Sequence, residues 1–495
     1  MKLSGDARLY LAVAGCAVIV HLGVLWNRFA LDDVVVIGQD PLVRSLSGLW
    51  QAFGEPYQRG AMYRPLTVAS YVLDWPLHSF VWYHAVNLVW HTGASVLVAV
   101  LARRWVGGMG ALAAGALFAV HPVHVEAVAN VVGRNELMAT CFALLAVYGA
   151  LVRGSLPWSA AAFALGLLCK ETAVVVPGLV VWGWLAGLAR PDRRRVVAFA
   201  ASWAAIVFVY SLVRWAVLHA HDDPFIAPVF AGLGPVAVRL TALAALADVA
   251  RLLVFPLTLR VDYSPAERTA VSSLPDVRLG LGVACLAAWA CLLVLTWRRG
   301  RRVEAFGLGW IAIAFSPVAN LLFPTGILVA DRTLYLPSVG LALAAGAWLE
   351  RLPARGLWPL MGAIVLLGGV RTALRVPVWR TDHTATLSIL EDSPRSYVGP
   401  KRMLAAYLDA HQPARALEAA RRATEIHWRD INLYLSGAVA AFAAGRPEVA
   451  DSLLGALNRL CPSCVGDYRR EAGVARAHGY AAAADSLDAR AREVP

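Results

Sequence analysis

Residues 9–26, LYLAVAGCAVIVHLGVLW, form an apolar run that is soon followed by the polar stretch Leu31-Asp32-Asp33. The run is long enough to cross a bilayer as one helix. The two adjacent carboxylates therefore lie at a membrane surface and not in a soluble cleft. This stretch predicts both the class of the protein and the place of its first polar chemistry.

The composition of the whole chain is typical of a membrane protein. Of its 495 residues, 59% are hydrophobic and 16% are charged, and the mean hydropathy is positive. The net charge of +12 does not indicate nucleic-acid binding, because most basic residues stand singly or in short clusters between apolar runs. Only Lys2, Lys170 and Lys401 are lysines, and this preference for arginine, with abundant alanine, is typical of a GC-rich bacterial genome.

Basic clusters between the apolar runs indicate which side of the membrane each loop faces. Lys2 and Arg8 place the amino terminus in the cytoplasm, and Arg193-Arg194-Arg195 is the strongest cytoplasmic marker. The pattern predicts an α-helical multi-pass membrane domain over residues 1–380, with about eleven transmembrane helices. The expected spans are residues 9–26, 84–101, 111–120, 136–152, 158–169, 172–188, 196–218, 280–296, 305–323, 338–349 and 357–369.

From about residue 395 the composition becomes soluble and helical, and a period of 34 residues is present. Three sets of residues fall in step: Tyr407, Ala441 and Ala475; His411, Gly445 and Gly479; Ala416, Ala450 and Ala484. Small residues at such offsets let paired helices pack closely, and the period matches tetratricopeptide (TPR) repeats. Residues 395–495 are therefore predicted to form a TPR α-solenoid of about three repeats, a kind of array that usually binds a peptide or another protein.

The expected sidedness places nearly all of the unusual polar groups on the outer face. They are Asp32, Asp33, Arg64, His121, His124, Glu126, Arg134, Lys170, Glu171, Asp331 and Arg332. A transporter would scatter its ionisable groups near the midplane instead. The cations Arg64, Lys170 and Arg332 stand beside aromatic and apolar neighbours, which suits binding of a phosphate at the lipid surface. The alternative for each cation is snorkelling to the lipid headgroups.

The carboxylates and histidines have more than one interpretation. Asp32 and Asp33 are candidates for a general base or metal ligand, or they are solvated loop residues that cap a short helix. His121, His124 and Glu126, with Asp33, have types that can ligate a divalent metal, while a substrate-shaping role and a structural role are the alternatives. No cofactor is certain from the sequence.

Two cysteines stand in a polar context, in Cys461-Pro-Ser-Cys464. The spacing resembles a redox motif, but no thioredoxin-like pattern of strand and helix surrounds it. We expect a disulfide between Cys461 and Cys464 at the end of a repeat.

Several stretches carry a resemblance to a known family, in the same order along the chain. They are Leu31-Asp32-Asp33, Tyr63-Arg64-Pro65-Leu66-Thr67, Tyr83-His84-Ala85-Val86-Asn87-Leu88, Phe118-Ala119-Val120-His121-Pro122-Val123-His124-Val125-Glu126-Ala127-Val128, Gly133-Arg134-Asn135-Glu136-Leu137, Leu168-Cys169-Lys170-Glu171-Thr172, Asp262-Tyr263-Ser264 and Asp331-Arg332-Thr333-Leu334-Tyr335-Leu336-Pro337-Ser338. Together with the trailing repeats they resemble the transmembrane and tetratricopeptide repeat-containing (TMTC) family of protein O-mannosyltransferases.

The resemblance implies a GT-C fold and inverting transfer of a sugar, in that family mannose, from a polyprenyl-phosphate donor to an acceptor hydroxyl. Asp32 is then expected to be the general base, with Asp33 orienting it or helping to hold a metal. Arg332, Arg64 and Lys170 would bind the donor phosphate. The sugar and acceptor pocket is expected to be lined by His121, His124, Glu126, Arg134, Glu171 and Asp331.

The expected setting is the periplasmic face of a bacterial inner membrane. The repeats would lie outside the cytoplasm and bind a protein or peptide acceptor at Ser or Thr, and membrane lipid would surround the helices. The same chemistry on a lipid or cell-envelope glycan is one alternative, and a transporter or flippase with a TPR docking domain is another.

Overall fold

A computed structural model of the chain describes residues 1–495 except 1–3, 58–61, 220–225, 255, 463 and 494–495. Within these limits all regular elements are helices, apart from one isolated bridge between Tyr57 and Met62. The chain divides into two compact units. We call Met1–Leu259 with Val271–Ala385 the membrane unit, and Arg260–Ala270 with Thr386–Pro495 the repeat unit.

The boundary at residues 385 and 386 lies between the expected limits of 380 and 395, but the segment Arg260–Ala270 also joins the repeat unit. The Ser393 hydroxyl donates to the carbonyl of Asp262 at 2.7 Å, and the Ser396 hydroxyl donates to the Asp262 carboxylate at 2.6 Å. A shift in composition does not reveal this segment, because its partners lie 131 and 134 residues away in the sequence.

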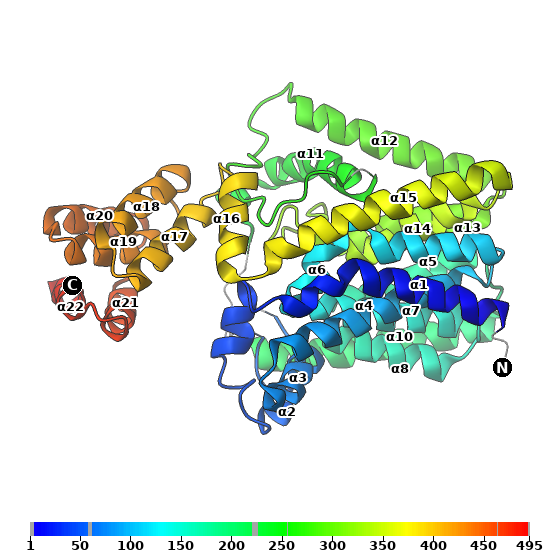
Figure 1. Ribbon diagram of the computed structural model, residues 1–495, viewed down its shortest axis with the longest axis horizontal. Coiled ribbons are helices and arrows are strands. Elements are labelled where there is room, and N and C mark those ends of the chain that lie inside the picture. The colour runs from blue at the N-terminus through cyan, green and yellow to red at the C-terminus, as the bar shows by residue number, and fades with distance from the viewer. Residues whose placement is uncertain (1–3, 58–61, 220–225, 255, 463, 494–495) are drawn as a thin grey trace. The chain divides into compact units, whose positions relative to one another are not determined.

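The membrane unit is a bundle in which α1, α4, α5, α14 and α15 run side by side (Figure 1). Its helices are α1 (Gly5–His21), α2 (Gly48–Gln51), α3 (Pro65–Asp74), α4 (Phe80–Ala102), α5 (Gly108–Val120), α6 (Val125–Ala129), α7 (Arg134–Leu151), α8 (Leu156–Cys169), α9 (Val176–Leu185), α10 (Arg193–Leu218), α11 (Pro235–Val254), α12 (Val277–Arg298), α13 (Arg302–Phe315), α14 (Tyr335–Leu349) and α15 (Ala354–Arg375). Helix α16 (Asp382–Asp392) leads from this unit into the repeat unit.

Small residues bring the central helices into backbone contact. A methyl group added at Gly340 of α14 would lie 2.3 Å from the carbonyl oxygen of Gly307 in α13, and one at Gly346 would lie 2.5 Å from that of Gly110 in α5. Such close approach is typical of helices that pack within a membrane. Helices α10 and α12 show the opposite character, because most of their apolar surface is exposed, as expected of lipid-facing helices.

Six helical segments in the described part of the chain are long and apolar enough to cross a membrane: Gly5–Trp26, Phe80–Ala102, Val131–Leu151, Arg193–Leu218, Val277–Arg298 and Arg355–Trp379. A seventh results if the bent pair Gly108–Val120 and Pro122–Ala129 forms one span. These segments are consistent with the expected α-helical membrane protein, but they are fewer than the expected eleven spans.

The other four expected spans coincide with α8, α9, α13 and α14, which have only 10 to 15 residues each. Helices of this length reach about 15–23 Å at 1.5 Å per residue, less than the hydrocarbon thickness of about 30 Å. Hydropathy does not separate a short buried helix from a span, so the number eleven stays a prediction.

Loops with arginine clusters meet at one end of the bundle. Arg103 pairs with Asp6 at 3.0 Å, and the Gly107 N–H donates to Glu350 at 2.8 Å. These loops surround a cavity of about 420 Å³ lined by Trp105, Val106, Gly187, Leu188, Gly300, Arg302, Val303, Glu304, Ala347, Glu350 and Arg351. The common end agrees with a positive-inside pattern, although Lys2 itself lies outside the described residues. Which side of the membrane this end faces stays a prediction.

The repeat unit contains three consecutive helix pairs: α17 (Val398–Asp409) with α18 (Pro413–Ile426), α19 (Ile431–Ala443) with α20 (Pro447–Leu460), and α21 (Val465–Ala477) with α22 (Ala481–Glu493). The residues found in step in the sequence have equivalent places. His411, Gly445 and Gly479 follow the first helix of each pair and have φ of 52°, 71° and 85°. This left-handed position ends a helix, which explains glycine at two of the three sites.

The third set that falls in step, Ala416, Ala450 and Ala484, has no exposed surface. These small residues lie in the second helix of each pair, where they allow the paired helices to approach closely. The spacing and burial agree with the expected repeats, and their assignment to the TPR class stays a prediction.

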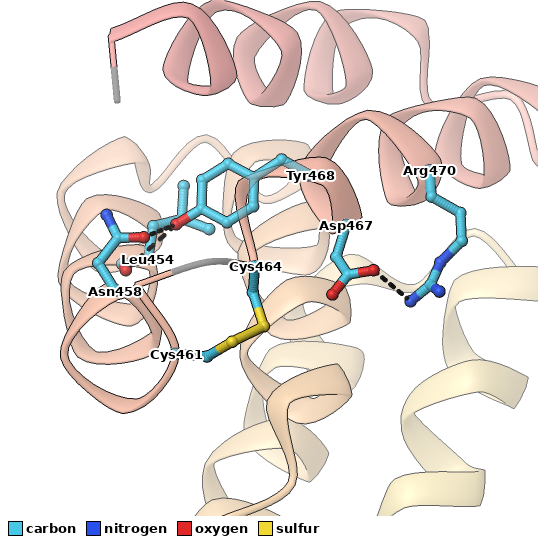
Figure 2. The surroundings of a disulfide bond; sticks show 7 residues. All are labelled: Leu454, Asn458, Cys461, Cys464, Asp467, Tyr468 and Arg470. Carbon is cyan, nitrogen blue, oxygen red and sulfur yellow. Dashed lines mark hydrogen bonds and ion pairs between the residues drawn. A yellow bond between two sulfur atoms is a disulfide. The ribbon is translucent and has the colours of Figure 1, made fainter. Parts of the chain in front are cut away.

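Cys461 and Cys464 lie between α20 and α21, and their sulfur atoms are bonded to one another (Figure 2). The Cα atoms are 5.4 Å apart. Next to the disulfide, the Tyr468 hydroxyl contacts the Asn458 side chain at 2.5 Å. The disulfide therefore closes the turn between the second and third helix pairs, the place where it is expected from the sequence.

Candidate functional site

The polar stretch after the first span forms a turn that presents Asp32 and buries Asp33. Asp32 is exposed, whereas Asp33 has no exposed surface. Helix α1 begins at the end of the bundle that holds the arginine clusters, where Asp6 pairs with Arg103, and the turn follows its opposite end. The site is therefore built at the end of the bundle away from those clusters.

Asp33 anchors the turn. One carboxylate oxygen accepts bonds from the N–H groups of Ala30 (3.3 Å) and Val131 (3.1 Å), and the other accepts one from Val132 (2.8 Å). Burial raises the pKa of Asp33 to about 7, although the three N–H donors favour its charged form. Because both oxygens are occupied by backbone donors, Asp33 joins the turn to η5 (Val131–Gly133) and presents no oxygen to a substrate.

Arg332 is held by Glu126 and lies within reach of the charge of Asp32. Its backbone N–H, in η9 (Asp331–Leu334), donates to the Glu126 carboxylate at 2.8 Å, and its guanidinium pairs with the other oxygen of the same carboxylate. Glu126 is buried on α6, while the Arg332 side chain is 27% exposed. The charge of Asp32 also acts on Arg332. An exposed carboxylate thus acts electrostatically on a partly exposed guanidinium.

Two more cations carry carboxylate partners in the same way. Arg64, before α3, forms a two-pronged pair with Glu171 at 2.6 and 3.0 Å and stacks over the Tyr57 ring at 5.2 Å. Lys170 pairs with Glu136, and both side chains are more than nine-tenths buried. Burial lowers the pKa of Lys170, and the charge of Glu136 opposes this shift.

The three pairs form one electrostatic unit, which we call the charged cluster: Arg64 with Glu171, Lys170 with Glu136, and Arg332 with Glu126. The charge of Glu136 acts on all three cations. The cluster joins the segment before α3, α6, the start of α7, the turn after α8 and η9. It brings together residues that are 34, 107 and 206 positions apart in the sequence.

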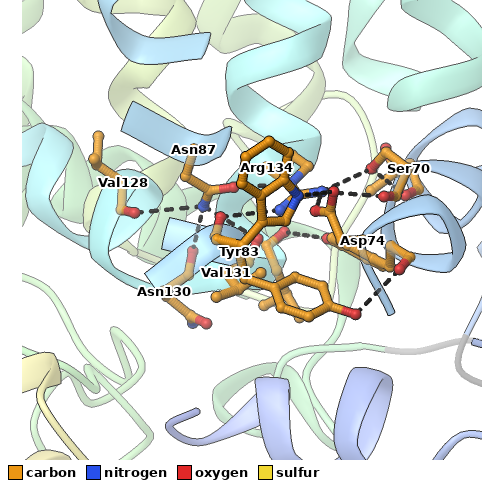
Figure 3. A network of polar contacts seen from close by, with 12 residues as sticks. Ser70, Asp74, Tyr83, Asn87, Val128, Asn130, Val131 and Arg134 are labelled. Atoms are coloured by element: carbon orange, nitrogen blue, oxygen red, sulfur yellow. Dashed lines mark hydrogen bonds and ion pairs between the residues drawn. The ribbon is translucent and has the colours of Figure 1, made fainter. Parts of the chain in front are cut away.

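Arg134 has a different place from the one expected. Its side chain is fully buried and pairs with Asp74, while it donates to Asn87 at 2.8 Å and to the Tyr83 carbonyl at 3.0 Å (Figure 3). The guanidinium also lies 5.0 Å from the ring centroid of Tyr71. A cation on α7 that is enclosed by partners on α3 and α4 ties these three helices together. Its expected role in the sugar and acceptor pocket stays a prediction.

His121 and His124 likewise contact other parts of the membrane unit. His124 has no exposed surface, its Nε2 lies 2.7 Å from the Ser338 hydroxyl, and its ring packs on Phe118 and Tyr335. His121 Nε2 lies 2.9 Å from the carbonyl of Leu253. These contacts give both histidines structural roles between helices.

The residues considered as metal ligands do not converge. Asp33 is occupied by three N–H donors, Glu126 by Arg332, and His124 by Ser338. Across the described ranges, no group of three or more His, Cys, Asp or Glu side chains could hold a metal ion. Asp331, expected in the pocket, is 3% exposed.

Glu136 and Tyr57 are members of the site to which the sequence assigned no role. Glu136 stands at the start of an expected span, and an ionisable residue in such a position is itself a functional signal. Tyr57 lies in a loop with no motif, and burial raises its pKa to about 12. Nothing in the sequence around Tyr57 indicates its contact with Arg64.

Comparisons with known proteins support a relationship to the TMTC proteins. The chain is 25% identical over 430 residues to human "Protein O-mannosyl-transferase TMTC3", covering 77% of this chain and 47% of that protein. It is 28% identical over 419 residues to the Caenorhabditis elegans "Protein O-mannosyl-transferase F38B6.6" (79% and 59%) and 29% identical over 419 residues to human "Protein O-mannosyl-transferase TMTC4" (67% and 53%). The chain thus spans about half the length of the curated relatives it matches.

No protein-family model and no solved structure matches the chain. The support for the family therefore comes from the named relatives, at 25–29% identity over most of the chain. These relatives and the apolar helices indicate a multi-pass membrane protein.

Proposed function

We propose that the chain is an integral-membrane glycosyltransferase that moves mannose from a polyprenyl-phosphate donor to a hydroxyl group of a protein. The relatives' names support transfer of mannose to protein, since they are called protein O-mannosyl-transferases. The observation that carries the proposal is the exposed carboxylate of Asp32, whose charge acts on Arg332 of the charged cluster.

In the proposed reaction the acceptor oxygen attacks the anomeric carbon of the donor sugar from the face opposite the phosphate. The new C–O bond forms as the bond to the phosphate oxygen breaks, so the configuration inverts. The hydroxyl proton passes to Asp32, which acts as general base. The polyprenyl phosphate leaves with both electrons of the broken bond and needs no proton to depart.

The cations of the charged cluster would hold the donor phosphate. Arg332 donates from Nη1 and from its backbone N–H to Glu126, and among the described residues its Nε and Nη2 have no hydrogen-bond partner. Arg64 donates from Nε and Nη2 to Glu171, so its Nη1 is left to bind a phosphate oxygen. Guanidinium groups suit phosphate oxygens because their planar N–H groups match the oxygen spacing. Lys170, more deeply buried, would act mainly through its charge.

We place the acceptor polypeptide on the repeat unit. A cavity of about 220 Å³ lies along α17, α19 and α21. Its lining includes Lys401, Asn432 and the pair formed by Asp409 and His478. Ser436, which donates to Glu471 at 2.7 Å, also lines it. A groove with this mixture of donors and acceptors suits an extended backbone. With the arginine clusters on the cytoplasmic side, the site and the repeats would face the periplasm of a bacterial inner membrane.

The test uses the full chain in liposomes, with synthetic undecaprenyl-phosphate mannose carrying a radiolabel and a mixture of Ser- and Thr-containing peptides. We expect labelled peptide from the parent protein and at least a hundredfold less from Asp32→Asn. Label found only in lipid or envelope glycan would replace the protein acceptor by those acceptors. Movement of intact donor across the bilayer, without product and without dependence on Asp32, would make the protein a transporter instead.

A further inference from the structure

The turn that presents Asp32 is held in an unfavourable backbone conformation. Leu31, the residue directly before Asp32, has a φ of 53°. This left-handed region is uncommon for residues other than glycine and costs a leucine conformational energy. The conformation therefore persists only where neighbouring groups hold it.

One of the groups that hold the turn comes from far along the chain. The N–H of Leu31 donates to a carboxylate oxygen of Asp382 at 2.8 Å, across 351 residues of sequence. Close by, the N–H of Arg28 donates to the carbonyl of Arg380 at 2.8 Å. The loop after the first helix is thus joined to the segment that opens α16, and both belong to the membrane unit.

Asp382 and Asp33 both hold the same short turn. Asp33 joins it to η5, and Asp382, the first residue of α16, joins it to that helix. Asp32 lies between these two anchors, and its own carboxylate is exposed. The direction of the Asp32 side chain follows from the backbone of Leu31, because the φ of that residue sets the course of the chain into Asp32.

We propose that Asp382 is a positioning residue that fixes the left-handed turn at Leu31 and so aims the Asp32 carboxylate at the acceptor hydroxyl. This inference rests on the proposed function, in which Asp32 is the base. A misplacement of about 1 Å at a reacting group can cost about a hundredfold in rate. For the Leu31 N–H, the role of Asp382 requires an oxygen acceptor at this place.

The first test measures mannose transfer by the full chain from synthetic undecaprenyl-phosphate mannose to a Ser/Thr peptide. Asp382→Ala should lower kcat about a hundredfold while the donor KM changes less than about twofold, since the charged cluster is untouched. Asp382→Asn should keep most of the activity, because its amide oxygen can accept the Leu31 N–H. Thr384→Ala is the matched control, since within the described part of the chain the Thr384 hydroxyl bonds only to Val378 and Thr381.

The second test asks whether the effect passes through the backbone of Leu31. Glycine adopts positive φ without a steric penalty. In a Leu31→Gly chain the turn should therefore depend less on its bond to Asp382. In that background Asp382→Ala should cost several-fold less in kcat than in the parent, a coupling that a double-mutant cycle detects. This comparison also tests the inference if the single Asp382→Ala variant folds poorly.

Three results would overturn the inference: equal loss in Asp382→Ala and Thr384→Ala, loss in Asp382→Asn as large as in Asp382→Ala, or additive effects of Leu31→Gly and Asp382→Ala. Failure of the proposed function is seen separately. If Asp32→Asn retains full transfer, Asp32 is not the base. If Asp32→Asn is inactive and Asp382→Ala matches the parent, the inference about Asp382 alone is wrong.

Discussion

Asp32 and Asp33 are adjacent carboxylates for which the structure predicts opposite phenotypes. Asp33 accepts bonds from three backbone N–H groups, of Ala30, Val131 and Val132, and has no exposed surface. Asp32 is exposed. Replacement of Asp33 should therefore lower stability, while replacement of Asp32 should lower turnover and leave stability unchanged.

The magnitude for Asp33 follows from the number of donors left without a partner. A buried donor that loses its acceptor costs about 1–3 kcal/mol, so Asp33→Ala should cost about 2–6 kcal/mol once the long bond from Ala30 is discounted. Asp33→Asn keeps one acceptor oxygen and can retain two of the three bonds. Its new amide group would then face the Val132 N–H, at a cost of about 1–3 kcal/mol.

The assay is thermal unfolding of the purified chain in detergent at pH 8, together with mannose transfer. Asp33→Ala should lower Tm by on the order of 10 °C and Asp33→Asn by less, whereas Asp32→Asn should melt like the parent. Turnover should fall by about 10²–10⁴-fold in Asp32→Asn. If Asp33→Asn melts like the parent and yet has no activity, Asp33 is the base and the assignment of the two residues must be reversed.

Further predictions concern the charged cluster, the repeats and the sidedness. Arg332→Lys should keep partial activity and Arg332→Ala should lose at least about 1.5–3 kcal/mol in kcat/KM for the donor; parent-like kinetics in both variants would remove Arg332 from the phosphate site. Glu136→Gln should destabilise the chain by about 3–5 kcal/mol in thermal unfolding, because Lys170 is left as an unpaired buried cation; an unchanged Tm would show that the pair is not formed. Gly445→Ala should lower the stability of the repeats by about 1–2 kcal/mol at its φ of 71°, whereas the helical control Gly466→Ala should not, and equal effects would argue against the left-handed cap. A reporter fused after residue 493 should be active only when exported, and activity in the cytoplasm would reverse the proposed sidedness.

The sequence located the helices well but not their lengths or neighbours. Apolar runs predicted every helix that is long enough to span, because burial in lipid requires a continuous apolar segment. The same runs in α8, α9, α13 and α14 are short. Composition alone does not distinguish protein from lipid as the surroundings of such a run.

The period of the repeats carried more information, because it is set by local geometry. His411, Gly445 and Gly479 share a left-handed backbone that any chain needs to end a helix and turn back. A residue type at a fixed spacing therefore indicates a backbone conformation. The disulfide between Cys461 and Cys464 is local in the same sense, since its cysteines are three positions apart in the sequence.

For the candidate site, the sequence indicated residue types and not their partners. Arg64, Lys170 and Arg332 each bond to a carboxylate from another segment, and only the folded chain shows which one. Arg134 lies in a motif like those of the other cations, but its depth in the bundle gives it a structural network. A motif does not show how deeply its residues are buried. A buried structural arginine and an arginine of the site therefore look alike in the sequence.

The pairing within the charged cluster also affects how such a chain can be made. Each helix is inserted into the membrane before any donor is bound, and an isolated charge at the edge of the hydrocarbon is costly. Glu136 lies on α7 and Lys170 directly follows α8, and these two neighbouring helices are synthesised one after the other. They can neutralise each other within a helical hairpin during insertion. Arg332 is synthesised after most of the membrane unit, and its partner Glu126 has been synthesised before it. Once the membrane unit has been synthesised, each cation of the charged cluster therefore carries a carboxylate partner before any ligand is bound.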